Sequence, residues 1–155
     1  MTVVVTHSTP ADGSFSATGA VAWDANHVVT GLDNISTAAV GYTINGGGAV
    51  ITTGIAGVGL TIPFNCTINE WTLQADVSGS IVIDIWKDTY ANFPPTVADT
   101  ITGSAKPTIS ASNKGNSSTL TGWTTSIAAG NVLYFNVDSC STITNVVLTL
   151  KVTKT

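Results

Sequence analysis

Apolar and polar residues alternate along two neighbouring stretches of the chain, and this alternation predicts its central strands. Between residues 66 and 75 the apolar side consists of Cys66, Ile68, Trp71, Leu73 and Ala75. Between residues 81 and 86 three isoleucines alternate with other residues, namely Ile81, Ile83 and Ile85 with Val82, Asp84 and Trp86. Alternation with a period of two in β-branched and aromatic residues is typical of half-buried strands. We therefore predict a hairpin over Phe64–Asp88, with its tight turn at Val77-Ser78-Gly79-Ser80.

The alternation slips once within the first of these strands. The apolar side passes from Ile68 to Trp71, one residue further than strict alternation allows. A β-bulge inserts one extra residue into a strand and restores the alternation beyond it. We predict such a bulge near Asn69-Glu70.

Similar alternation recurs on both sides of the hairpin and predicts an all-β fold. Further strands are expected over residues 38–45, 49–53, 117–123, 132–138 and 144–152, separated by turns rich in Gly, Asn and Ser. About eight strands without a long helix are typical of an antiparallel β-sandwich or jelly roll. We assign residues 39–155 to this domain. The long connection at residues 89–107 is expected either to be functional or to pack across one end of the sandwich.

Residues 1–38 form a different region, which we interpret as an extended N-terminal arm. The region has too few large apolar residues to build a core of its own. An arm of this kind is expected to pack on a partner or on other copies of the chain. Its candidate assembly anchors are Phe15, Trp23 and His27.

The composition excludes several classes of partner. Only 9% of the 155 residues are charged, whereas about 25% is usual for a soluble domain. The formal net charge is −4, arginine is absent, and the five lysines are scattered along the chain. Nucleic acids and anionic membranes are bound through clustered basic residues, so we expect neither partner. The low charge also suggests a covered surface, for which contacts in a homo-oligomer are the simplest explanation.

Cys66 and Cys140 are the only cysteines, and both fall in or beside predicted strands. Buried free thiols are the simplest interpretation, and a disulfide between neighbouring strands stays open. A metal site needs more ligands, and no histidine is near either cysteine in the sequence. The N-terminus has neither the charged start nor the long apolar run of a signal peptide, so we expect synthesis and folding in a cytoplasm.

Candidate catalytic chemistry is sparse, and we predict that the protein is not an enzyme and needs no cofactor. The chain contains no nucleophile elbow, zinc-protease motif or phosphate-binding loop, and His7 and His27 both lie in the arm. Asp84 and Asp88 fall on one strand face, with Asp138 on a candidate neighbouring strand. Such carboxylates can bind calcium or act as an acid–base pair, but solvated or turn-capping aspartates are the simpler interpretation.

Four aromatic residues, which we expect to be exposed at or near the ends of predicted loops, form the second candidate site. They are Trp86, Tyr90, Phe93 and Trp123. Aromatic rings offer flat apolar faces to sugars, while neighbouring Asn, Asp and Thr residues provide hydrogen bonds. The alternative is that these rings cap the open ends of the sandwich core. Both interpretations are carried forward.

Several segments resemble those of virion proteins of tailed bacteriophages. The segment Ser80–Pro107 is similar to a domain found at the C-terminus of phage tail-fibre and related structural proteins, and Leu120–Gly130 and Phe135–Ser139 belong to the same pattern. The resemblance covers roughly residues 46–155. In the arm, Thr9–Phe15 and Ala22–His27 are similar to segments that precede such domains in longer phage proteins.

The resemblance implies a trimeric β-sandwich displayed on the surface of a virion. Because the chain is short and has no fibre shaft or collagen-like repeat, a capsid decoration or cement role is expected alongside a tail-fibre role. The expected partners are further copies of the chain and other capsid or tail proteins. A receptor-binding head that contacts a host glycan through the loop aromatics is the alternative.

Overall fold

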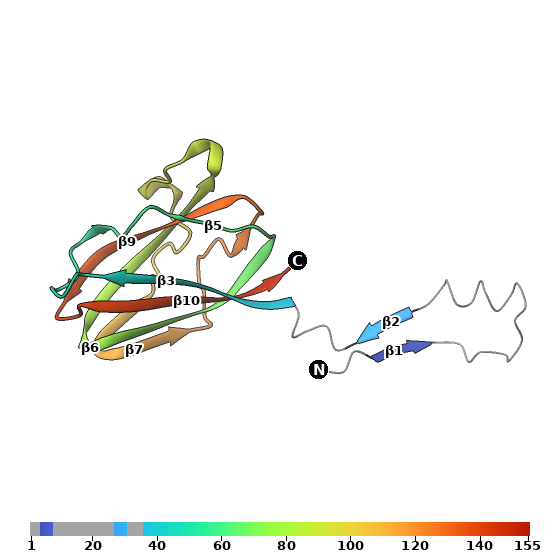
Figure 1. Cartoon of the computed structure of the whole chain (residues 1–155), viewed down its shortest axis with the longest axis horizontal. Helices are drawn as coiled ribbons and strands as arrows, with labels where there is room; N and C mark the ends of the chain where they lie inside the picture. The colour runs from blue at the N-terminus through green and yellow to red at the C-terminus, as the bar shows by residue number, and fades with distance from the viewer. Residues whose placement is uncertain (1–3, 8–26, 31–35) are drawn as a thin grey trace, which may run out of the picture. The chain divides into compact units, whose positions relative to one another are not determined.

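The computed structural model describes residues 4–7, 27–30 and 36–155 (Figure 1). The chain separates into two units, residues 1–37 and residues 38–155. In the first unit, β1 (Val4–His7) and β2 (His27–Thr30) pair antiparallel. The candidate anchors Phe15 and Trp23 lie outside the described residues, and His27 is described only by its backbone, as the first residue of β2.

The second unit is built from strands and two short 3-10 helices. Its elements are β3 (Thr37–Asn45), β4 (Gly54–Ile55), β5 (Leu60–Thr61), β6 (Cys66–Thr89), η1 (Tyr90–Asn92), η2 (Val97–Asp99), β7 (Thr108–Ser117), β8 (Ser126–Ile127), β9 (Asn131–Ser141) and β10 (Asn145–Lys154). The first residue of β3, Thr37, falls in the first unit. The prediction of an all-β antiparallel fold is confirmed. Within the described part of the chain, no helix is long and apolar enough to cross a bilayer.

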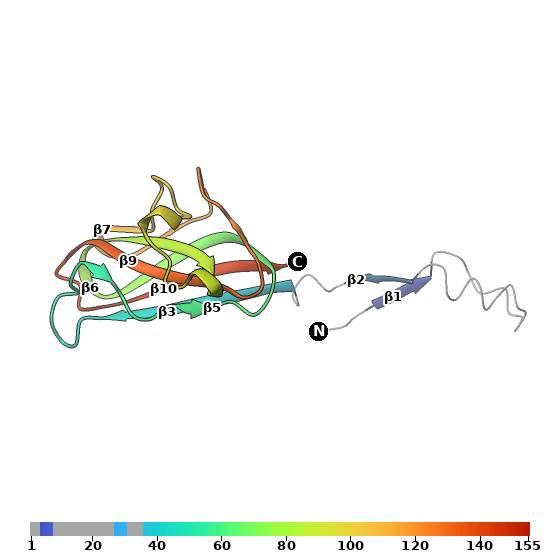
Figure 2. The same cartoon turned by 90° about the horizontal axis from the view of Figure 1, so that it is seen from above.

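All eight strands belong to one sheet, which folds over on itself. The main order is β3-β10-β6-β9-β4, while β7 and β8 pair with β6 and β5 pairs with β9. Because β6 is sharply bent, one half of the sheet packs against the other and the result is sandwich-like (Figure 2). Both β3 and β4 end the strand order, so they lie at the two outer edges of this folded sheet.

The predicted hairpin over Phe64–Asp88 is wrong, because β6 is one continuous bent strand. Its first half pairs with β10, from Cys66 opposite Lys154 to Ala75 opposite Val146. Its second half pairs with β9, from Ser80 opposite Ser141 onwards. The two halves therefore do not pair with each other, and the residues assigned to the tight turn form the bend.

The phase of the alternation explains why one strand forms here. Trp71, Leu73, Ile81, Ile83 and Ile85 all have odd numbers and are all buried. A four-residue turn at residues 77–80 would instead have placed Leu73 opposite Asp84, on the face away from the isoleucines. A single strand keeps all five apolar side chains on one face, because side chains of one parity share a face.

Gly79 lets the bend pass close to the connection between β9 and β10. A Cβ atom at this position would lie 2.4 Å from the carbonyl oxygen of Ser141 and 2.8 Å from Cγ1 of Ile143. β7 follows β6 around the bend, since it pairs with Gln74 through Lys114 and with Gly79 through Ser112. Four residues of β6, residues 75–78, thus lie between two pairs that are separated by a single residue in β7.

The predicted bulge near Asn69-Glu70 is confirmed. Along β10, Lys151 lies opposite Glu70 and the next residue, Val152, lies opposite Ile68, so Asn69 is the extra residue. The bulge moves the apolar side from even to odd positions and keeps both Ile68 and Trp71 in the core. The side chain of Asn69 points to solvent, where its amide donates to the Thr153 hydroxyl at 2.6 Å.

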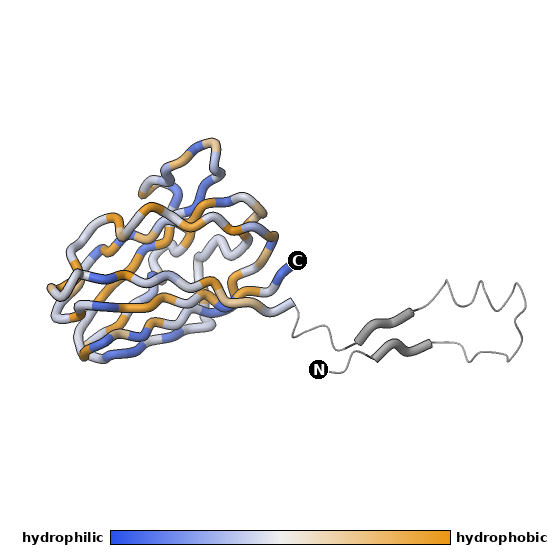
Figure 3. Tube along the Cα trace, in the orientation of Figure 1, coloured by the Kyte–Doolittle hydropathy of each residue, from blue (hydrophilic) through white to orange (hydrophobic). Residues whose placement is uncertain are grey.

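The core lies between the two halves of the folded sheet. Figure 3 shows the alternation of apolar and polar residues along the strands that produces it. Phe135 of β9 stacks on Tyr42 of β3 with ring centroids 4.4 Å apart, which joins the two layers. The apolar side chains with the deepest burial are Leu73, Ile81, Ile83, Ile85, Leu133, Ile143, Leu148, Leu150 and Val152.

Candidate functional site

The outer face of the second half of β6 carries the candidate site. Asp84 and Trp86 alternate with the core isoleucines and so point away from the core, yet they are only 1% and 8% exposed. They are covered because the connection between β6 and β7 folds back over them. The packing of this connection against β6 explains why a charged residue is buried on this face.

The end of this connection runs beside β6 almost as a further strand. The amide of Ile101 donates to the carbonyl of Ile85 at 2.8 Å, and Thr100 forms an isolated bridge with Trp86. Further along, the amide of Ile83 donates to the carbonyl of Pro107 at 3.0 Å. Between these two attachments, residues 102–106 leave the strand edge and loop over Asp84. We call residues 100–106 the strap.

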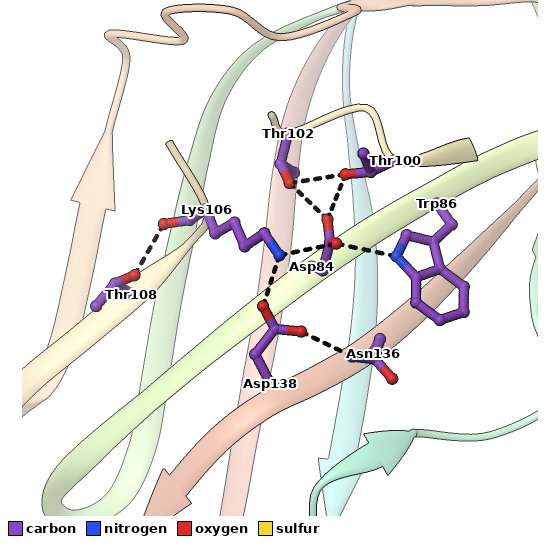
Figure 4. A network of polar contacts seen from close by, with 8 residues as sticks. All are labelled: Asp84, Trp86, Thr100, Thr102, Lys106, Thr108, Asn136 and Asp138. Carbon is purple, nitrogen blue, oxygen red and sulfur yellow. Dashed lines mark hydrogen bonds and ion pairs between the residues drawn. The ribbon is translucent and has the colours of Figure 1, made fainter. Parts of the chain in front are cut away.

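The Asp84 carboxylate fixes the strap to β6 (Figure 4). Its Oδ1 atom accepts hydrogen bonds from the hydroxyls of Thr100 and Thr102, both at 2.6 Å. Its Oδ2 atom accepts one from the indole Nε1 of Trp86 at 3.0 Å and forms an ion pair with Lys106 Nζ at 3.0 Å. Both oxygens thus have hydrogen-bond or ion-pair partners. These partners offset the free-energy cost of burying the negative charge.

Lys106 extends this network to β9. Its ammonium lies 2.6 Å from Oδ2 of Asp138, whose other oxygen accepts from the Asn136 amide at 2.7 Å. The lysine therefore bridges two carboxylates from neighbouring strands. Since the Lys106 side chain is 26% exposed, its ammonium lies at the rim of the network while Asp84 lies inside.

The network controls the protonation of its members. Burial opposes ionisation of Asp84, but the hydrogen bonds from Thr100, Thr102, Trp86 and Lys106 outweigh it and lower the pKa of this carboxyl. The hydrogen bond to Asp138 and the interactions with Asp84 raise the pKa of Lys106, although desolvation opposes them. Both groups are therefore held in their charged forms at neutral pH.

These contacts revise both interpretations of the aspartates. Asp84 is neither solvated nor a turn cap, and the lysine ammonium occupies the place that a cation would take beside it. Asp88 is separate from the network and accepts from the amide of Thr89 and the side-chain amide of Asn92. Among the described residues, no three His, Cys, Asp or Glu side chains are grouped so as to hold a metal ion.

Three of the four candidate aromatic residues lie around the same end of β6. Phe93 packs edge-on against Tyr134 of β9 with centroids 5.6 Å apart, and Tyr90 lies 6.3 Å from Phe93. Trp86 belongs to a buried cluster with Val132 and Tyr134, so the prediction that its ring is exposed is wrong. Tyr90 and Phe93 remain 74% and 45% exposed, and they form an aromatic platform above that cluster.

Trp123 does not join the platform. It packs against the main core, and its indole Nε1 donates to the carbonyl of Ala105 at 2.8 Å. Its neighbour Thr124 donates from its amide to the carbonyl of Ile101. Trp123 and Thr124 therefore attach the strap to a second segment of the chain besides β6.

Several residues of the site escaped the sequence reasoning. Tyr134 supports the platform, and Thr100, Thr102 and Lys106 hold Asp84. The one available signal was the aspartate in an otherwise apolar strand, because such a residue needs donors from another segment. Nothing in the sequence indicated which segment supplies them.

The two cysteines are free thiols. Cys66 is buried and Cys140 is half-buried, and desolvation raises the pKa of each thiol. The Cys140 thiol contacts the carbonyl of Ile143 at 3.6 Å. The interpretation of two unpaired thiols therefore holds, with Cys140 less deeply buried than predicted.

Comparison with known proteins does not assign the chain to a family. The sequence matches no family model, and it matches no curated protein.

Proposed function

We propose that the protein is a non-enzymatic structural protein of a tailed-phage virion. In this proposal it is displayed on the particle surface as an oligomer, with a trimer as the expected state, and is anchored by its N-terminal arm. Its place is that of a capsid decoration or cement protein, or of a tail-fibre component. The support from the sequence is the resemblance of Ser80–Pro107 to domains of such proteins.

The main structural support for a non-enzymatic role is that both carboxylate oxygens of Asp84 are engaged by other groups of the protein. Asp84 is the only buried charged residue among those described, and each of its oxygens is engaged by donors of the protein itself. A catalytic carboxylate needs an open approach to a substrate and a group with which to exchange a proton. A carboxylate closed in this way stabilises a connection and has no open approach for a substrate, which supports a non-enzymatic role for this site.

The assembly role can be tested by removing the first unit. Deletion of residues 1–36 ends just before β3 begins at Thr37 and leaves the sandwich strands intact. We expect the shortened protein to fold, with an unchanged far-UV spectrum, but no longer to join particles assembled in its presence. Incorporation at the level of the full chain would contradict anchoring by the arm.

A receptor-binding role is the second candidate, and the aromatic platform favours it. Tyr90 and Phe93 expose large ring surfaces, while Asp88 and Asn92 provide polar groups beside them. Stacking of a sugar on an aromatic ring combined with hydrogen bonds from adjacent polar groups is a common binding mode. In this alternative the ligand is a host surface glycan.

Glycan-array binding discriminates the two candidates. If the platform binds sugar, Tyr90→Ala abolishes binding without loss of stability, because this side chain is 74% exposed. The matched control is Val97→Ala, which shortens another exposed apolar side chain, 67% exposed, on the same connection. Absence of binding to any glycan, or equal binding by both variants, would remove the receptor-binding alternative.

A further inference from the structure

One stretch of the sandwich unit contains no charged residue. Residues 34–69, which include β3, β4 and β5, have no Asp, Glu, Lys or Arg. Every charged residue of the second unit lies between residues 70 and 154. Interfaces between proteins are depleted of charge at their centre, so the surface that this stretch contributes is a candidate contact.

The charge-free stretch contains a pocket and exposes two large apolar side chains. The pocket has a volume of about 380 Å³ and lies between the end of β3 and β4. Its lining is mixed, with the apolar residues Ile44, Ile51 and Ile55 beside the polar residues Thr43, Asn45 and Thr52. The side chains of Ile55 and Val58 are 55% and 83% exposed. We call this surface, residues 38–59, the neutral face.

The walls of the pocket are held in place by the fold. The hydroxyl of Tyr42 donates to the carbonyl of Ala56 at 2.5 Å, and the Tyr42 ring stacks on Phe135. Gly57 passes so close to Tyr42 that an added Cβ would collide with its hydroxyl. The pocket is therefore formed in the single chain, which lowers the cost of filling it on association.

The edge of the sheet beside the pocket is unprotected. β3 ends the strand order, and along residues 38–45 no other described strand pairs with its outer side. Exposed edges are usually shielded by charged residues or proline, because they offer free backbone groups to other strands. β3 has neither, as its sequence is TAAVGYTIN. A strand of this kind is expected to be covered in the assembled protein.

We infer that the neutral face is the contact between copies of this chain. The face carries both a pocket and, in Val58, a protruding apolar side chain, so that each copy presents both halves of the contact. The second unit has six acidic residues and five lysines, a net charge of −1, so electrostatic repulsion between two copies is weak. A partner protein with a strongly charged surface has no oppositely charged residue to pair with on the neutral face.

This inference rests on one part of the proposed function, namely that the protein forms a homo-oligomer. The neutral face is the surface through which the copies in that oligomer contact one another. The position of the protein in a virion plays no part in the argument.

The test is the mass of the full chain in solution, measured by sedimentation velocity over a range of concentrations. We expect an oligomer for the natural sequence and association weakened roughly tenfold or more in Val58→Lys and in Ile55→Lys, since each places an ammonium in an apolar contact. Val97→Lys is the matched control, because Val97 is an exposed valine outside the neutral face. It is expected to associate like the natural chain.

Three results would overturn the inference: a monomer at all concentrations, association unchanged in both neutral-face variants, or equal loss in the control. Val58→Ser provides a milder variant whose folding is not at risk, and it is expected to weaken association in the same direction. Detection of the protein in purified virions is independent of these results. Failure there would contradict the proposed function and leave the contact standing.

Discussion

At the level of single residues, Asp84 determines how the connection between β6 and β7 is held. A buried carboxylate in an apolar strand is unfavourable by itself, and here four donors from the strap and β6 compensate for it. The residue therefore specifies one position of the strap instead of adding to the core. Its removal leaves those donors without their acceptor.

We predict that Asp84→Asn lowers the free energy of unfolding by about 1–3 kcal/mol. The asparagine side chain keeps the shape but loses the charge opposite Lys106, and its amide nitrogen faces groups that are themselves donors. The cost is limited because Lys106 keeps its ion pair with Asp138. Urea unfolding measures the change, with Asp88→Asn as a control that stays within about 0.5 kcal/mol.

Acidification is expected to remove the same contribution. Because the folded-state pKa of Asp84 lies below the unfolded value of about 3.9, the folded state binds fewer protons than the unfolded state. The stabilisation is therefore complete above about pH 5 and is lost as the pH falls through the folded-state pKa. Asp76, whose pKa is lowered first by its hydrogen bond from Thr144, acts with the same sign.

Unfolding free energies measured between neutral pH and pH 2 check this prediction. The difference between the natural chain and Asp84→Asn should be constant above about pH 5 and should shrink at lower pH. A difference that stays constant down to pH 2 would mean that Asp84 does not titrate as the network requires.

At the level of elements, the bent strand β6 decides the architecture. Its first half lies between β10 and β7 and its second half between β9 and β7, so a single strand belongs to both layers. The bend depends on the close passage of Gly79 against the backbone of Ser141. A side chain at this position would push the two layers apart or distort the connection between β9 and β10.

We therefore predict that Gly79→Val destabilises the protein by about 1–3 kcal/mol, as overpacking does in a tightly packed site. Gly41→Ala in β3 is the control, because the nearest atom to its added Cβ is a carbonyl oxygen of Leu148 at 4.0 Å. Thermal unfolding of both variants measures the effect. Equal melting temperatures would show that β6 bends without needing a glycine at residue 79.

The elements also show which parts of the fold can be predicted from the sequence alone. Alternation identified the β6 core residues and the bulge at Asn69, because both depend on local periodicity. The sequence predicts a hairpin instead of the bend because Ser-Gly-Ser is a common turn sequence, whereas the shared parity of Leu73 and Ile81 favours a single strand. The strap could not be predicted, since the donors for Asp84 come from residues that are ordinary in the sequence and meet it only through the fold.

At the level of the whole molecule, the division into two units matches the division of labour that we propose. The sandwich unit has a closed polar network, an exposed aromatic platform and a neutral face, which are features of a scaffold with surfaces for contact. Among its described residues the first unit has a two-stranded sheet, and two strands that pack on nothing else are only marginally stable in water. Such a unit is expected to gain stability from a partner, which is consistent with an anchoring role.

The most direct test of a virion role is the copy number of the protein in purified particles, determined by quantitative mass spectrometry against the major capsid protein. The proposal predicts that the protein is present in a fixed ratio to the capsid protein. A ratio close to that of the capsid subunits indicates decoration of the capsid, and a few copies per particle indicate the tail. A protein that is produced in infected cells but is absent from purified particles would contradict the proposed function.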